Sequence, residues 1–131
     1  MIYSTKIERK KYNLEERLID YSAQIISFAK QMEKDYISNY LHGQFVRSGL
    51  STALNFAEGQ SAESQKDYIH KMKIALKELR ETRMSLRIIE RTDLVQNKKP
   101  LQELLQENNE LISIFVKSVS TASERLNVFK K

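Results

Sequence analysis

The sequence predicts an all-α protein, folded as an antiparallel up-and-down four-helix bundle in a single domain of residues 1–131. Apolar residues recur at alternating steps of three and four along four long segments, which is the spacing of one helix face. Turn-forming residues are scarce, with one proline and three glycines, whereas all-β and α/β folds need many turns. Short connections between consecutive helices make neighbouring helices antiparallel.

The first helix is expected over residues 13–35. Asn13 suits the N-cap position, and Glu15 and Glu16 lie in the first turn, where carboxylates interact favourably with the helix dipole. The apolar seam of this helix has the heptad spacing of a bundle helix. Its members are Leu14, Leu18, Tyr21, Ile25, Phe28 and Met32.

The second helix is expected over residues 38–58, ending at Gly59, which can adopt the left-handed conformation that closes many helices. The middle of this helix consists of small residues, which let two helix backbones approach closely. We therefore expect the tightest helix contact of the bundle there. The small residues are Ser48, Gly49, Ser51, Thr52 and Ala53.

The third and fourth helices are expected over residues 65–91 and 100–129. Ser64 followed by Asp67 resembles a capping box, with Asp in place of the usual Glu. Asn108 interrupts the apolar seam of the fourth helix. An asparagine at such a position can fix the helix register or the oligomeric state at some cost in stability.

Composition excludes several classes of protein. Because the chain has no cysteine, it can form neither disulfides nor thiolate metal sites. No stretch approaches a membrane span, and the first residues hold no apolar run long enough for a signal peptide. The sequence therefore predicts a cytoplasmic protein without a membrane partner.

The sequence offers no constellation of catalytic residues, and we expect neither enzyme activity nor a cofactor or metal. A di-iron bundle needs a pair of Glu-x-x-His motifs, and the only near match is the single pair Asp67 and His70. Ser64 shares one helical face with them, but nothing resembles a nucleophile elbow, and helix capping accounts better for Ser64 and Asp67. An uncharacterised enzyme is the least favoured hypothesis.

One side of the third helix carries a row of six basic residues with no acidic residue among them, here called the basic stripe. Residues 61–100 hold ten Lys and Arg against six Asp and Glu, which gives +4 of the formal net charge of +5. Lys and Arg contact nucleic-acid phosphates without reading the sequence, although a merely solvated face would also explain the stripe. The candidate nucleic-acid-binding residues are Lys66, Lys73, Lys77, Arg80, Arg87 and Arg91.

Several large apolar residues lie outside the helix seams, although four helices share only one core. Such surplus apolar residues are typical of subunit contacts, so we expect a homo-oligomer. The residues are Ile19, Ile26, Phe45, Phe56, Ile69, Ile74 and Ile88.

Glu58 is placed unusually, because it ends the second helix, where the negative end of the helix dipole disfavours a carboxylate. We expect a positive partner to offset it. The candidates are Arg47, Arg83 and the free amides at the start of the third helix. A catalytic role for Glu58 has no base or metal partner to support it.

Three runs in the middle of the chain resemble a known family. Residues 44–51 (QFVRSGLS), 55–59 (NFAEG) and 75–79 (ALKEL) resemble the four-helix-bundle proteins encoded in intervening sequences of bacterial large-subunit ribosomal RNA genes. The resemblance implies that the positions matching the family pattern are structural elements of the junction between the second and third helices. These positions are Arg47, Ser51, Asn55, Glu58 and Gly59.

The resemblance implies a small bacterial bundle of a family that often forms ring-shaped homopentamers. Its relatives include the accessory protein of diversity-generating retroelements, a basic pentamer that associates with nucleic acid and with a reverse transcriptase. The chain lacks the proline that the family usually carries before its second helix, so the subgroup stays open. The leading hypothesis is a non-enzymatic, oligomeric accessory protein that associates with the RNA or DNA backbone through the basic stripe. The alternative is a protein-interaction scaffold with no nucleic-acid role.

Overall fold

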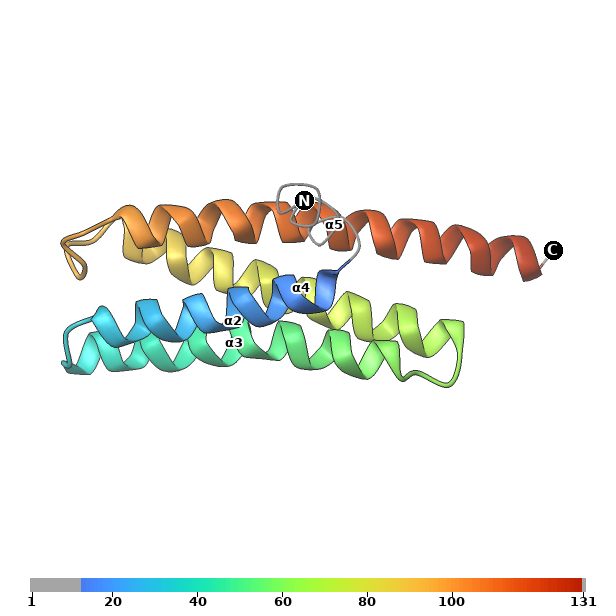
Figure 1. Cartoon of the computed structure of the whole chain (residues 1–131), viewed down its shortest axis with the longest axis horizontal. Helices are drawn as coiled ribbons and strands as arrows, with labels where there is room; N and C mark the ends of the chain where they lie inside the picture. The colour runs from blue at the N-terminus through green and yellow to red at the C-terminus, as the bar shows by residue number, and fades with distance from the viewer. Residues whose placement is uncertain (1–12, 131) are drawn as a thin grey trace, which may run out of the picture.

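The computed structural model describes residues 13–130, with side chains as far as Asn127, so the two ends of the expected 1–131 domain lie outside the described residues. Four helices form an antiparallel up-and-down bundle (Figure 1), and no strand occurs among residues 13–130, which confirms the predicted fold class. The helices are α2 (Leu14–Gln31), α3 (Tyr36–Gln60), α4 (Gln65–Glu90) and α5 (Lys99–Lys130).

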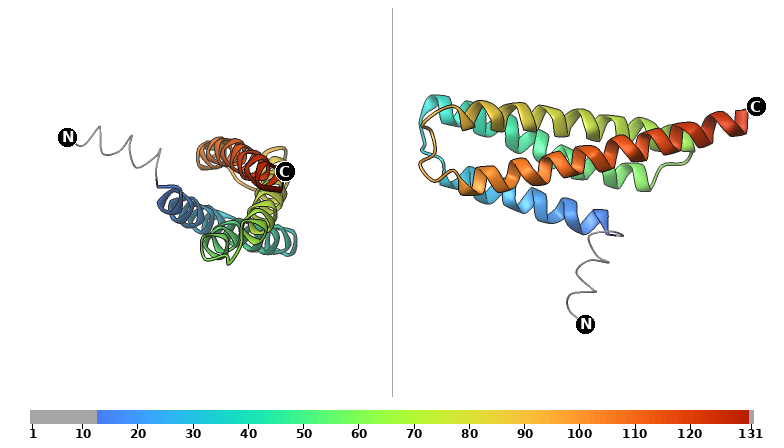
Figure 2. Two further views of the ribbon diagram at one scale, coloured as in Figure 1. Left: turned by 90° about the vertical axis from the view of Figure 1, so that its right-hand side faces the viewer. Right: turned by 90° about the horizontal axis from the view of Figure 1, so that it is seen from above.

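The helices follow one another around the bundle, so each packs against its sequence neighbours, and α2 closes the circle against α5 (Figure 2). Their lengths differ, since α2 has 18 residues and α5 has 32. Because α2 begins near the middle of the bundle, one half contains four helices and the other contains only α3, α4 and α5 (Figure 1). We call these the four-helix half and the three-helix half.

Capping side chains fix where α2 and α3 begin. The Asn13 side chain accepts a hydrogen bond from the backbone N–H of Glu16 at 3.0 Å, which confirms the predicted N-cap of α2. Asp35 accepts one from the N–H of Ser38 at 2.8 Å and so caps α3. The helix expected over residues 13–35 therefore ends at Gln31, and α3 begins ahead of residue 38.

Two glycines of α3 mark close helix approaches. A Cβ on Gly49 would lie 3.1 Å from Cγ1 of Ile25 in α2, as the small residues in the middle of this helix predict. The prediction that Gly59 ends the helix in a left-handed conformation is wrong, because α3 continues to Gln60 and no described residue has a positive φ. Gly59 is buried instead, and a Cβ there would lie 3.4 Å from Cβ of Lys71 in α4.

The core takes side chains from all four helices and includes three residues whose sequence pattern predicts subunit contacts. Phe45, Phe56 and Ile69 are only 0%, 8% and 7% exposed, so that prediction is wrong. Phe45 packs on Phe28, with ring centroids 5.7 Å apart, and Phe56 packs on Phe115 at 6.1 Å. A bundle helix buries its flanks against two neighbours, which makes its apolar face wider than one heptad seam.

A layer of polar side chains crosses the buried core. Asn108 of α5 is fully buried and donates from Nδ2 to the Tyr21 hydroxyl of α2 at 2.9 Å and to the Leu79 carbonyl of α4 at 3.0 Å. The hydroxyls of Ser48 in α3 and Thr82 in α4 lie 2.7 Å apart. Burial raises the pKa of Tyr21 to about 12, and the hydrogen bond from Asn108 opposes that rise. We infer that this layer fixes the helix register, because its partners meet in only one alignment.

Candidate functional site

All six residues of the basic stripe are exposed to solvent along α4 and at Arg91, which caps its C-terminus. The helix starts where the sequence predicts, because the Ser64 hydroxyl accepts a hydrogen bond from the N–H of Asp67 at 3.1 Å. Among the described residues, none of the six stripe side chains takes part in an ion pair. Their charges are therefore left to solvent and to any partner.

The interhelical ion pairs use other cations, and the most buried of these is Arg17 of α2. Arg17 is bound by a fork of two hydrogen bonds to Glu107 of α5, at 2.9 Å from Nε and 2.6 Å from Nη2. Its Nη2 also donates to Glu110 at 3.2 Å. The hydrogen bond to Glu107 raises the pKa of Arg17 and outweighs the desolvation that would lower it. Arg17 thus joins the first and last helices and is not available to a ligand.

Three further ion pairs join α3 to α4. Arg47 contacts Glu78 at 3.3 Å and Glu81 at 3.0 Å, and the hydrogen bond to Glu81 is the main cause that raises the pKa of Arg47. Glu58 pairs with Lys71 at 2.7 Å, so the expectation that Arg47, Arg83 or the free amides of the third helix offset its charge is wrong. The register of α3 against α4 decides these partners, and it places Arg47, near the middle of α3, opposite the middle of α4.

The remaining residues of the family pattern are held within or beside α3. The Asn55 side chain donates from Nδ2 to the Ser51 carbonyl of its own helix at 2.9 Å. Gly59 lies against α4, and the neighbouring Glu58 forms its ion pair with Lys71 across the turn between α3 and α4. The Asn55 bond lies within α3, and the contacts of Gly59 and Glu58 join α3 to α4. All three contacts therefore serve the packing of these two helices.

The basic stripe borders a groove between α4 and α5 that contains three stripe cations and one carboxylate. Three of its seven lining residues, Leu76, Met84 and Val119, are apolar and offer contact to sugars and bases. Its one carboxylate, Glu81, is already bound by Arg47. The lining residues are Lys73, Leu76, Lys77, Arg80, Glu81, Met84 and Val119.

The same side of the bundle becomes mixed in charge toward the four-helix half. There Arg87 of the stripe shares a second groove with three carboxylates, and Gln102 donates a hydrogen bond to one of them, Glu90, at 2.8 Å. The charged lining residues of this second groove are Arg83, Arg87, Glu90, Lys99, Glu103 and Glu110. We therefore expect Lys73, Lys77 and Arg80 to attract a polyanion more strongly than Arg87 does.

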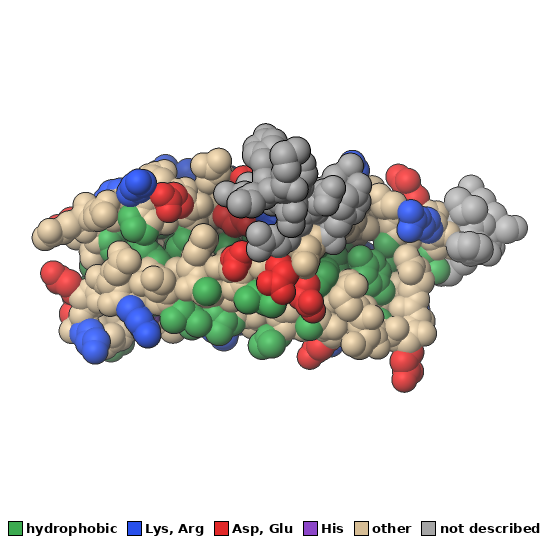
Figure 3. All heavy atoms as spheres, viewed as in Figure 1, with side chains coloured by type: hydrophobic (Ala, Val, Ile, Leu, Met, Phe, Trp, Pro, Cys, Tyr) green, Lys and Arg blue, Asp and Glu red, His purple; other side chains and the backbone are tan. Residues whose placement is uncertain are grey.

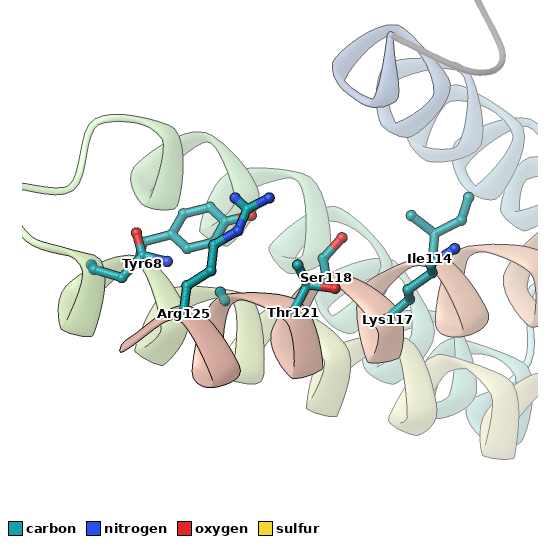
Figure 4. A pocket seen from close by; sticks show the side chains of 8 residues that line it. Tyr68, Ile114, Lys117, Ser118, Thr121 and Arg125 are labelled. Carbon is teal, nitrogen blue, oxygen red and sulfur yellow. The ribbon is translucent and has the colours of Figure 1, made fainter. Parts of the chain in front are cut away.

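A third groove, on the other flank of α5, contains cations that the sequence analysis missed (Figure 4). Arg125 and Tyr68 lie at one end of it and Lys117 and Ile114 at the other, with the Thr121 hydroxyl between them. The missed signal is the order of charges along residues 101–131, which hold four basic and four acidic residues. Three of the four acids precede residue 111, and all four cations follow it.

Neither histidine lies in a cluster that suggests catalysis. His42 is half-buried and its Nε2 lies 2.9 Å from the Ala29 carbonyl, while His70 is exposed on α4. Within residues 13–127 no three side chains of the metal-ligating types come together to hold a metal ion. None of the described helices is long and apolar enough to cross a membrane.

Apolar side chains gather on the outer surface of α2 and α3 (Figure 3). Ile19 and Ile26 of α2 are 51% and 40% exposed, and Leu54 of α3 is 64% exposed. Of the other residues expected at subunit contacts, Ile88 is 48% exposed and Ile74 is half-buried. Ile19, Ile26 and Leu54 are here called the α2/α3 apolar face.

A model of one protein family, described as 23S rRNA-intervening sequence protein, matches residues 10–117 of the chain. A protein of unknown function from the S23 ribosomal protein family of Bacteroides thetaiotaomicron has a similar crystal structure, with a TM-score of 0.72. It is 24% identical, and the match covers 80% of this chain and 96% of that one, so the likeness shows the fold alone. A search of curated proteins finds no match.

Proposed function

The chain belongs to the family of 23S rRNA-intervening sequence proteins, and we propose that it is a non-enzymatic, oligomeric bundle of the cytoplasm that binds the phosphate backbone of RNA or DNA. The basic stripe on α4 is the binding surface. The observation that supports this proposal is that all six stripe cations are exposed and that none takes part in an ion pair among the described residues.

The stripe has the dimensions of a backbone-binding surface. From Lys66 to Arg91 the helix rises roughly 38 Å, at 1.5 Å per residue. One strand of duplex DNA presents about 11 phosphates over that length. Contacts of Lys and Arg to phosphates position a protein without reading bases, so the binding has weak sequence preference and falls steeply with salt.

Self-association would present several stripes on one particle. The α2/α3 apolar face lies on different helices from the stripe, so a neighbour can cover Ile19, Ile26 and Leu54 while α4 stays accessible. A ring of five subunits is the form that the family resemblance implies, and several weak sites on one particle bind a long polyanion more tightly than one. A reverse transcriptase is the further partner if the chain belongs to the retroelement subgroup.

The test is a nucleic-acid titration repeated across salt concentrations from about 50 mM upward. Reversing the charges of Lys73, Lys77, Arg80 and Arg87 to Glu is expected to abolish retention of RNA and DNA at low salt. Removing positive charge anywhere weakens such binding, so a matched pair of variants is needed as well.

The matched pair changes net charge equally at different places. Lys73→Glu/Lys77→Glu alters two stripe residues, and Lys30→Glu/Lys117→Glu alters two exposed lysines of α2 and α5 outside the stripe. We expect the first pair to reduce affinity and the magnitude of the salt slope, and the second to leave both near wild type. Equal effects of the two pairs of substitutions on affinity would refute the proposal that the basic stripe is the binding surface. Light scattering that shows a monomer at micromolar concentration would refute self-association.

A protein-interaction scaffold is the second candidate function, and the α2/α3 apolar face is the observation that favours it. Contiguous exposed apolar residues mark protein contacts more often than nucleic-acid contacts. A stoichiometric co-purified protein, together with no nucleic-acid binding at about 50 mM salt, would favour the scaffold over the nucleic-acid function.

A further inference from the structure

Two tyrosines at the start of α3 are the most exposed aromatic side chains of the described chain. Tyr36 is 86% exposed and Tyr40 is 62% exposed, whereas the other described aromatic residues are buried or half-buried. The two rings are four residues apart and therefore lie on one side of the helix. Neither ring contributes to the core, so their exposure has no explanation in the packing of the bundle.

The ion pairs of Arg47 show where these rings lie relative to α4. Tyr40 precedes Arg47 by seven residues, which is two helical turns, so both lie on the same side of α3. Ile88 follows Glu81, a partner of Arg47, by the same two turns on α4. Because α3 and α4 are antiparallel, Tyr40 lies at the level of Ile88, with Tyr36 one turn nearer the end of the bundle.

The surface around Ile88 joins the tyrosines to the basic stripe. Ile88 is 48% exposed, and Met84, one turn before it on α4, is 62% exposed. Arg87 adjoins Ile88 in sequence and Arg91 lies one turn after it, and both guanidinium groups are free of ion pairs among the described residues. The exposed rings of α3, the exposed aliphatic groups of α4 and the Arg91 guanidinium thus lie at the same end of the bundle, with Arg87 on the α5 side of α4.

We propose that Tyr36 and Tyr40 are a base-stacking site next to the basic stripe, and that the ligand of this protein is single-stranded nucleic acid. This proposal rests on the proposed function, because the stripe must hold the backbone. Proteins that bind single strands combine a cationic track for phosphates with aromatic rings on which unpaired bases stack. The bases of a duplex are already stacked on each other and cannot reach such rings.

Two carboxylates near this site take part in contacts of the fold. Glu81 is bound by Arg47, and Asp35 accepts the N–H of Ser38 as the cap of α3. A protein partner would meet the same rings, but the unpaired cations beside them match a polyanion better than an ordinary apolar partner surface.

The experiment compares Tyr36→Leu/Tyr40→Leu with Tyr36→Phe/Tyr40→Phe. Leucine keeps apolar contact but removes the ring, whereas phenylalanine keeps the ring and removes only the hydroxyl. Each variant is titrated with a single strand of about 20 nucleotides, longer than the site of one single-strand module, and with the duplex of the same sequence. The Leu variant is expected to lose roughly tenfold or more in single-strand affinity with duplex affinity unchanged, and the Phe variant to match wild type.

Tyrosine emission supplies a readout independent of affinity. The chain has no tryptophan, so its emission comes from six tyrosines. Stacking of a base on Tyr36 or Tyr40 quenches their share of the emission, and the Phe variant, which still binds, lacks that quenching. Both side chains are exposed, so the variants are expected to melt as the wild type does.

Several outcomes would overturn the proposal, and they are distinguishable from failure of the proposed function. Equal loss of single-strand and duplex affinity in the Leu variant, or no loss at all, would refute stacking while leaving the stripe as the phosphate site. A changed particle mass with unchanged nucleic-acid affinity would assign the tyrosines to a contact between copies. A wild-type protein that binds neither ligand would refute the proposed function and this inference together.

Discussion

The cations that join the helices and the cations of the basic stripe differ in what they touch. Arg17 has a side chain only 12% exposed and holds two carboxylates of α5, and Arg47 and Lys71 reach acids across the α3–α4 contact. The stripe residues are exposed and take part in no ion pair among residues 13–127. A net charge of +5 therefore says little by itself, because only the cations that the fold leaves unpaired can attract a partner.

The most direct way to sharpen this comparison is to remove Arg17. Arg17→Met leaves Glu107 and Glu110 without their partner beside a partly buried site, and we expect it to lower the free energy of unfolding by about 2 kcal/mol. Arg47→Met is the matched control, because the Arg47 side chain is 54% exposed. We expect that variant to cost less than about 1 kcal/mol. Urea unfolding of both measures the difference, and equal losses would contradict the distinction between them.

Ionisation of the buried Tyr21 tests in a second way how a buried charge differs from an exposed one. The pKa of Tyr21 is raised to about 12, so the folded protein keeps the phenol protonated at a pH where an unfolded chain, with its pKa near 10, has lost the proton. The stability that this provides is complete below pH 10 and is lost as pH rises toward 12. We expect a fall of about 1–3 kcal/mol over that range.

Denaturant unfolding at a series of pH values measures this fall, with Tyr21→Phe as the control. Both proteins carry the same lysines, whose titration near the same pH affects them equally. The pH dependence that belongs to Tyr21 is therefore the difference between the two curves. Parallel curves from pH 9 to 12 would show that Tyr21 ionises as it does in the unfolded chain.

The smallest expected effect is a gain in stability when one lysine of the basic stripe is replaced by glutamate. Lys73 and Lys77 are four residues apart on α4 and repel each other. Lys73→Glu replaces this repulsion by an attraction in the favoured order, acid before base, and we expect a gain of about 0.5 kcal/mol at low salt. Thermal unfolding at low and high salt measures it. A loss of stability that persists in high salt would mean that Lys73 has a structural role.

The helices could be predicted from the sequence because apolar periodicity is local, and a stretch such as Leu14 to Met32 contains its own signal. The end of α3 could not be predicted in this way. Gly59 is a good helix terminator in isolation, but here the packing of α4 at Lys71 and Tyr68 continues the helix past it. Tertiary contacts override a local preference at that point.

The candidate site likewise combines local features that the sequence predicts with features that depend on tertiary contacts. The exposure of the stripe follows from helical periodicity, whereas the pairing of Arg17 with Glu107, 90 residues away, depends on the final register of α2 against α5. The heptad seam also underestimates the core, which is why Phe45 and Phe56 were expected outside it. Tyr36 and Tyr40 gave no signal in the sequence, because a tyrosine every fourth residue fits a buried face as well as an exposed one.

The shortness of α2 has a consequence for how the molecule opens. Because α2 spans only the four-helix half and is joined to α5 by polar contacts at Arg17 and Tyr21 alone, it is the element least held by the rest of the described chain. We expect the amide hydrogens of α2 to exchange with solvent before those of α3 and α4, because α3 and α4 share the most extensive contact between any two described helices. Detachment of α2 would uncover the Phe45 side of the core while leaving α4, and with it the proposed binding surface, folded.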